Sequence, residues 1–142
     1  MELFINATVW YINVAMETIF DGLSIEFDEA KKLFVIKNSG RRSYGVIREG
    51  IRRLREKVQG SNTKFNLLID WTEFDGFNEA YDKLLEPGLM KTAEMVSRVA
   101  FVTGHKWENE ARRLQALFPY VQSNIFEPHE RTAAEHWLIG EK

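Results

Sequence analysis

The sequence predicts an α/β domain with a mixed sheet of about five strands and four to five helices. Short apolar or alternating runs typical of strands recur along the chain, and stretches with the three-to-four spacing of amphipathic helices separate them. Strands that alternate with helices favour a mostly parallel sheet, which one early hairpin makes mixed. A chain of 142 residues fits one domain, 1–142, with an apolar extension at 1–20 and a core at 21–140.

The predicted hairpin opens the core. Residues 23–27 alternate apolar and polar side chains, as a half-buried strand does, and residues 33–37 are more continuously apolar. The polar stretch from Asp28 to Lys32 is short enough to be the turn between two antiparallel strands.

An amphipathic helix is predicted over residues 43–59. Its apolar positions recur every three or four residues, at Tyr44, Ile47, Ile51, Leu54 and Val58. Ser43 is a good N-cap, and Gly60 is a residue at which helices often stop.

The remaining strands are predicted at 65–70, 99–103 and 123–126. The run FNLLID at 65–70 is too apolar for a solvated edge, so we expect a central strand there. Helices are predicted from Phe77 to before Pro87, and again from Leu89 to Val96. A further one runs from Trp107 to Phe118, and Pro128 opens the last.

Composition excludes several classes of site. The chain has no cysteine, so disulfides, thiolate nucleophiles and zinc–thiolate sites are excluded, and a reducing cytoplasm is the expected compartment. With three histidines and a net charge of −2, we expect no metal site, no cofactor and no wholesale nucleic-acid binding. No stretch is apolar enough to predict a membrane span.

The apolar segment at residues 3–15 is expected to pack against another surface. Ten of the thirteen residues from 3 to 15 are apolar, and many are β-branched or aromatic, so we expect a strand. A large apolar patch is rarely left in water, which predicts either a homodimer through this segment or an added edge strand in a monomer. Met16 is an alternative start of the chain.

The C-terminal half resembles the SpoIIAA-like branch of the STAS superfamily. The resemblance is carried by Arg98–Gly104, by Lys106-Trp107, by Ile125-Phe126, and by Glu130, Ala133-Ala134 and Trp137-Leu138; upstream Asp70, Phe74, Gly76 and Ala80 match a strand–loop–helix. It spans about residues 21–140 and implies a mixed sheet with helices. Relatives of this fold act as anti-sigma-factor antagonists, and CRAL-TRIO lipid-binding domains are similar in shape.

One departure from the relatives concerns phosphorylation. Anti-sigma antagonists carry an Asp-Ser pair where this chain reads Asp75-Gly76-Phe77. Since neither position 76 nor 77 has a hydroxyl, we expect no serine phosphoswitch.

Two segments are expected to meet as loops at the carboxyl ends of neighbouring strands, where α/β sheets bind ligands. The candidate ligand-binding residues are Asp70, Trp71, Thr72, Glu73, Phe74, Asp75, Thr103, Gly104, His105, Lys106 and Trp107. They could hold an apolar, amphipathic or anionic small molecule, with Lys106 and helix amides facing an anion. Alternatively, the tryptophans are core anchors and the charges are solvated. A weaker alternative is an enzyme that pairs His105 with Asp70, Glu73 or Asp75.

The helix at 43–59 is basic. Residues 41–57 hold seven Arg or Lys against two Glu, and Arg48, Arg52 and Arg55 share one face. This face could dock an acidic protein partner, or it could be an ordinary solvated surface with i,i+4 ion pairs. Taken together, the sequence favours a binding or regulatory module over an enzyme, with protein interaction first and a small apolar or amphipathic ligand as the alternative.

Overall fold

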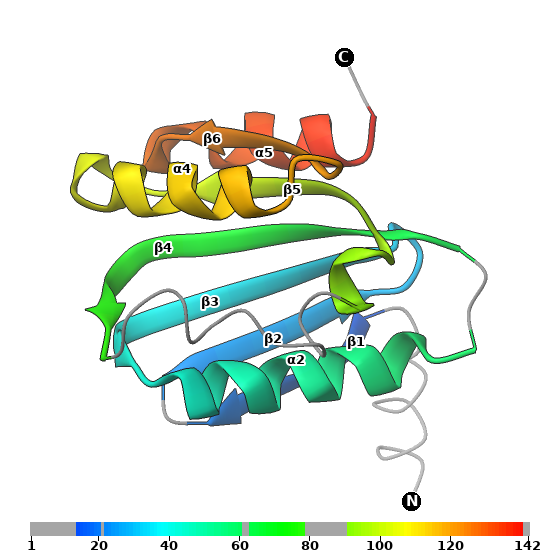
Figure 1. Cartoon of the computed structure of the whole chain (residues 1–142). Helices are drawn as coiled ribbons and strands as arrows, with labels where there is room; N and C mark the ends of the chain where they lie inside the picture. The colour runs from blue at the N-terminus through cyan, green and yellow to red at the C-terminus, as the bar shows by residue number, and fades with distance from the viewer. Residues whose placement is uncertain (1–13, 21, 61–62, 79–90, 141–142) are drawn as a thin grey trace, which may run out of the picture.

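The computed structural model describes residues 14–20, 22–60, 63–78 and 91–140, and its strands form one six-stranded sheet in sequence order (Figure 1). The first three strands pair antiparallel; they are β1 (Val14–Phe20), β2 (Leu23–Asp28) and β3 (Leu33–Arg42). The last three run parallel to β3; they are β4 (Phe65–Phe77), β5 (Val96–Val102) and β6 (Gln122–Phe126). The mixed α/β fold and all five predicted strands are therefore confirmed.

The helices divide between the two faces of the sheet. Helices α2 (Tyr44–Val58) and α4 (Glu108–Leu117) lie on one face, and α5 (Arg131–Leu138) lies on the other (Figure 1). Short 3-10 turns precede the last two helices, η2 (His105–Trp107) before α4 and η3 (Pro128–Glu130) before α5.

Helix α2 forms where the sequence predicts it. The Ser43 hydroxyl accepts a hydrogen bond from the backbone N–H of Val46, which satisfies one of the free amides at the helix start. Leu54 and Val58 are buried against Phe34 and other apolar side chains of β2, β3 and β4. The apolar stripe of the helix thus faces the sheet, and its charged residues face solvent.

The opposite face is closed by α5. Leu33, Leu68 and Ala100 project from β3, β4 and β5 toward Ala134 and Leu138, and all five are buried. Asn66 and Arg98 add polar contacts, because their side chains donate to the backbone carbonyls of Leu138 and Trp137.

The segment 70–77 is a strand, so the prediction of a loop there is wrong. Strand β4 continues to Phe77 because β3 also continues, and their pairing resumes beyond an irregularity, with Ser39 opposite Glu73 and Arg42 opposite Phe77. The helix predicted from Phe77 otherwise falls outside the described residues.

The structure describes only the end of the strand predicted at residues 3–15. Residues Val14 and Ala15 belong to β1, which pairs with β2 at the edge of the sheet, and residues 3–13 lie outside the described part of the chain. Within the described residues, no helix is long and apolar enough to cross a membrane.

Candidate ligand site

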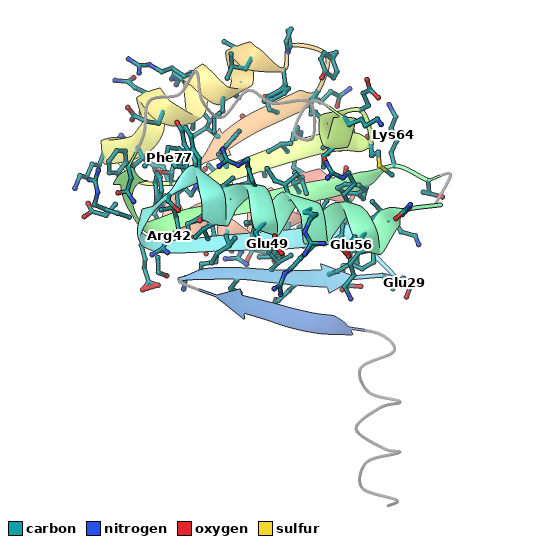
Figure 2. The ribbon with its side chains drawn as sticks, turned by 60° about the horizontal axis from the view of Figure 1, so that its bottom comes forward. Glu29, Arg42, Glu49, Glu56, Lys64 and Phe77 are labelled. Atoms are coloured by element: carbon teal, nitrogen blue, oxygen red, sulfur yellow. The ribbon has the colours of Figure 1, made fainter. Side chains whose placement is uncertain are left out.

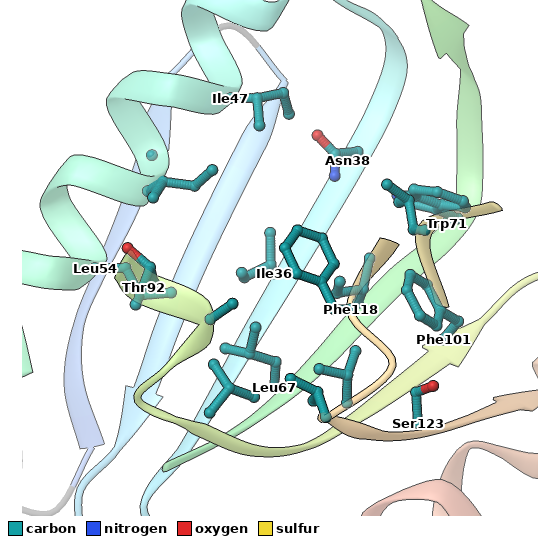
Figure 3. Close-up of a pocket in the computed structure, with 18 of the residues that line it drawn as sticks. Ile36, Asn38, Ile47, Leu54, Leu67, Trp71, Thr92, Phe101, Phe118 and Ser123 are labelled. Atoms are coloured by element: carbon teal, nitrogen blue, oxygen red, sulfur yellow. The ribbon is translucent and has the colours of Figure 1, made fainter. Parts of the chain in front are cut away.

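An apolar cavity of about 160 Å³ lies between the sheet and the helices α2 and α4 (Figure 3). Its floor is formed by the central strands, with Ile36 from β3, Leu67 from β4 and Phe101 from β5. Ile47 and Leu54 of α2 form one wall. The cavity sits over the middle of the sheet, where a domain of this kind normally has its most tightly filled core.

The lining is uncharged as far as the described residues show. Its polar side chains are Asn38, Thr92, Gln115 and Ser123, and the rest of the lining is aliphatic or aromatic apart from Gly50. A buried charge without a partner is strongly unfavourable, so this cavity suits a neutral molecule.

Of the eleven candidate residues predicted from the sequence, only Trp71 lines this cavity. Trp71 is buried and stacks on Phe74 with ring centroids 4.6 Å apart. On the far side of Phe74 lies Trp107, whose indole Nε1 donates to the Phe74 carbonyl oxygen at 2.7 Å. The two predicted segments therefore do meet, but Phe74 and Trp107 fill the space between them with an aromatic cluster.

Gly76 is required for that cluster. Its φ of +103° is strained for residues with a side chain, and a Cβ atom there would lie 2.9 Å from the Trp107 ring. The ring therefore occupies the space that a side chain at position 76 would need.

The charged candidates are engaged in ion pairs. Buried Asp70 points to the α5 face, where its carboxylate accepts from Arg131 at 2.9 Å and from the hydroxyl and backbone N–H of Thr72. On the surface, Glu73 pairs with Lys37 at 2.8 Å, and the hydrogen bond and charge of Glu73 raise the pKa of that lysine. Since neighbouring residues of a strand point to opposite faces, Asp70 and Trp71 cannot serve one pocket.

Lys106 and His105 lie at the surface. Lys106 pairs with Asp75 at 3.2 Å and lies over the Trp107 ring. His105 is 85% exposed, and its ring nitrogens lie 3.6 Å from a Glu108 oxygen and 3.3 Å from a Glu127 oxygen. The predicted pairing of His105 with Asp70, Glu73 or Asp75 is therefore not the arrangement found.

The last two candidate residues, Thr103 and Gly104, follow the end of β5. Thr103 is buried, and its hydroxyl donates to the Gly104 carbonyl oxygen.

The first turn of α4 is acidic. Hydrogen bonds from Arg112 and His105 lower the pKa of Glu108, so this turn carries a carboxylate. A second carboxylate, Glu110, lies in the same turn.

A group of exposed residues follows β6. Glu127, His129 and Glu130 place ligand atoms within 4.8 Å of one another. Glu127 and Glu130 each accept a hydrogen bond from the other's backbone N–H, which caps η3. This reciprocal capping gives the two carboxylates a structural role.

The basic face of α2 is an ion-pair network. Arg52 binds both Glu49 and Glu56, and Arg53 also reaches Glu49. Figure 2 shows the two glutamates along the helix. Hydrogen bonds from Arg52 and Arg53 lower the pKa of Glu49 to about 2. Arg48 is exposed and Arg55 is half-buried.

Sequence reasoning missed the residues that line the cavity, Asn38 above all. The strand predicted at 33–37 stops one residue before Asn38, whereas β3 continues through it, with the apolar residues Phe34 and Ile36 on the same face. A polar residue in phase with a buried apolar stripe is the signal that could have singled it out.

A family model described as SpoIIAA-like matches residues 33–139 of the chain. The chain belongs to the SpoIIAA-like family. A crystal structure from Shewanella loihica, of an uncharacterised DUF3478-family protein with a SpoIIAA-like fold, superposes with a TM-score of 0.66. The two are 23% identical, and the match covers 87% of this chain and 99% of that one. No curated protein matches the chain. This SpoIIAA-like domain thus shares its fold with proteins of uncharacterised function.

Proposed function

We propose that this SpoIIAA-like domain is a binding module rather than an enzyme, and that it holds a small, neutral, mostly apolar molecule in the cavity between the sheet, α2 and α4. The observation that supports this is the hollow at the middle of the sheet. Ile36, Leu67 and Ile69 lie on central strands and line the cavity, and they are still only half-buried.

The volume sets the size of the ligand. An apolar cavity of about 150 Å³ is large enough to bind benzene, whereas drug-sized ligands occupy pockets of roughly 300–1,000 Å³. At about 160 Å³ the cavity fits one aromatic ring or a short branched chain. A long lipid would need more space than the described lining provides.

The alternative of an anionic ligand has less support. Lys106, the cation expected to face such a ligand, is paired with Asp75. The first turn of α4 carries Glu108 and Glu110, which oppose the binding of an anion at that helix end. The cavity lining adds no cation among the described residues.

A thermal shift with toluene tests the proposal. A ligand that binds only the folded state raises the melting temperature as its concentration exceeds the dissociation constant. We expect toluene to raise the melting temperature of the native protein, and Ile36→Phe, which fills the cavity, to remove the effect. The matched control is Val35→Phe on the opposite face of the same strand, which should keep it. No shift in the native protein with toluene, or with its hydroxyl analogue phenol, would refute the proposal.

The absence of a serine phosphoswitch is part of the same proposal. A serine at position 76 would place its Cβ against Trp107 in a backbone conformation that favours glycine. Regulation of this domain is therefore better attributed to ligand binding than to phosphorylation at this position.

A protein-docking role is the second candidate. Exposed Arg48 and Arg52 lie one turn apart on α2 and could face an acidic partner in the cytoplasm. Copies of the chain could also pair through residues 3–15, since β1 is the last strand at its edge among the described residues. Light scattering on the full chain and on a chain starting at Met16 tests the dimer, which the truncation should weaken.

A further inference from the structure

Apolar packing does not explain the side chain of Asn38 in the cavity lining. Asn38 is 3% exposed, and its amide oxygen Oδ1 is buried without a hydrogen-bond partner among the residues that the structure describes. Buried side-chain polar atoms are nearly always paired, and an unpaired one is unfavourable for the folded state. An orphan acceptor on the wall of a cavity therefore indicates a partner that occupies the cavity.

Strand alternation places this amide on the cavity face, in phase with Phe34 and Ile36, and an irregularity of β4 lies opposite it. The pairing of β3 with β4 passes from Lys37–Asp70 to Ser39–Glu73, so Asn38 alone faces both Trp71 and Thr72. Irregularities of this kind in a strand pair are common beside functional sites. The hydroxyl and backbone N–H of Thr72 both donate to Asp70 Oδ1, which occupies these donors away from Asn38.

The surroundings of the amide are apolar. Figure 3 shows Asn38 on the cavity wall among Ile47, Trp71 and Phe118. The torsion that turns an asparagine amide is soft, so Oδ1 can rotate toward the cavity without leaving a favoured conformation. Oδ1 is an acceptor only, so its partner must be a donor.

We propose that Asn38 is the polar anchor of the cavity and that the ligand is a small apolar molecule bearing one neutral donor, a hydroxyl or an N–H. This inference rests on the proposed function and adds the chemical class of the ligand. A purely hydrocarbon ligand, or one whose only polar atom is a carbonyl or ether oxygen, would leave Oδ1 unpaired. A charged ligand would lack a counterion among the described lining residues.

Phenol and toluene form a matched pair of probes, because they have nearly the same shape and differ by a hydroxyl in place of a methyl group. Their dissociation constants are measured by calorimetry for the native protein and for Asn38→Leu. We expect the ratio of phenol affinity to toluene affinity to fall by about five-fold or more in the variant, the size of one net hydrogen bond. An unchanged ratio would overturn the inference while leaving the proposed function standing. Binding of neither probe to the native protein would overturn both.

Two further readouts separate an anchor from a structural residue. Without ligand, Asn38→Leu should melt no lower than the native protein, because it removes an unpaired buried acceptor; a large drop would assign Asn38 a structural role instead. In the native protein, the NMR resonances of the Asn38 side-chain amide should move with phenol well beyond their shift with toluene. Equal shifts with the two probes would also overturn the inference, whatever the variant does.

Discussion

The two faces of the sheet are built differently. On the α5 face, Leu68 and Ala100 are completely buried beneath Ala134 and Leu138. On the α2 and α4 face, the neighbouring residues Leu67 and Val99 are only half-buried and line the cavity. Both faces are made from the same strands, so the difference lies in what covers the strands on each side. α5 packs directly on the central strands, whereas the described part of the α2 and α4 face leaves a cavity of about 160 Å³ above them.

This comparison separates stability from function. A filled face maximises burial and dispersion contacts, whereas a hollow face gives up part of that stabilisation. The aromatic cluster of Trp71, Phe74 and Trp107 limits the loss, because it packs densely beside the cavity. We therefore infer that the α5 face supports the fold, and the binding site proposed above lies on the opposite face.

The difference in packing between the two faces of the sheet is tested most directly by comparing Leu68→Ala with Leu67→Ala. Leu68→Ala removes a fully buried side chain from the filled face and should lower the free energy of unfolding by about 2–5 kcal/mol. Leu67→Ala removes a side chain that is only half-buried and should lower the free energy of unfolding by only about 1–2 kcal/mol. Chemical denaturation of both variants gives the two values. Equal losses would show that the two faces are packed alike.

Gly76→Ser tests the aromatic cluster that bounds the hollow face. The substitution forces a side chain into a φ of +103° and against the Trp107 ring. We expect a loss of about 1–3 kcal/mol in the free energy of unfolding, together with a change in tryptophan fluorescence. Gly60→Ser is the control, because its φ is also positive at +86° but nothing lies within 4 Å of its Cβ position. A loss no greater than in this control would mean that contact with Trp107 adds nothing.

Much of the fold was predictable from periodicity. The spacing of Ile47, Leu54 and Val58 and the cap at Ser43 predict α2 almost to the residue, because local hydrogen bonding and burial agree there. The end of β4 was not predictable in the same way. Gly76 and the surrounding charges are typical of a loop, and only long-range pairing with β3 keeps Phe74 and Phe77 in a strand.

The candidate site was predicted in part. The approach of Trp107 to Phe74, and of Lys106 to Asp75, follows from the rule that parallel strands end at a common edge of the sheet. The cavity could not be read from the sequence, because Ile36 and Leu67 look like ordinary core residues. Whether such residues pack fully depends on the distance between the helices and the sheet. The periodicity of apolar residues does not determine this distance.

Arg131→Ala tests how much the ion pair of Arg131 with Asp70 stabilises the α5 face. Arg131 donates to the buried carboxylate of Asp70, but its own side chain is 39% exposed, so solvent weakens the pair. We expect a loss of about 1–2 kcal/mol, since the Asp70 carboxylate keeps its hydrogen bonds from Thr72. A double-mutant cycle with Asp70→Asn measures the coupling, and zero coupling would show that the pair adds nothing to the face.

The smallest effect is expected outside the hollow face, on the exposed surface of α2. Hydrogen bonds from Arg52 and Arg53 lower the pKa of Glu49 to about 2, so its carboxyl group should titrate in NMR spectra well below the ordinary glutamate value of 4.5. Because folding lowers the pKa of Glu49, the contribution of this network to stability is present above the pKa of the unfolded chain. It is lost as pH falls from about 4.5 toward 2.

Arg52→Gln should raise the Glu49 pKa toward its ordinary value and leave the melting temperature at pH 7 almost unchanged, since the pairs are exposed. Phenol binding should not change either, because Arg52 does not line the cavity. If Arg52→Gln weakened phenol binding, the outer surface of α2 would be coupled to the site, and the separation of the binding face from the solvated surface would fail.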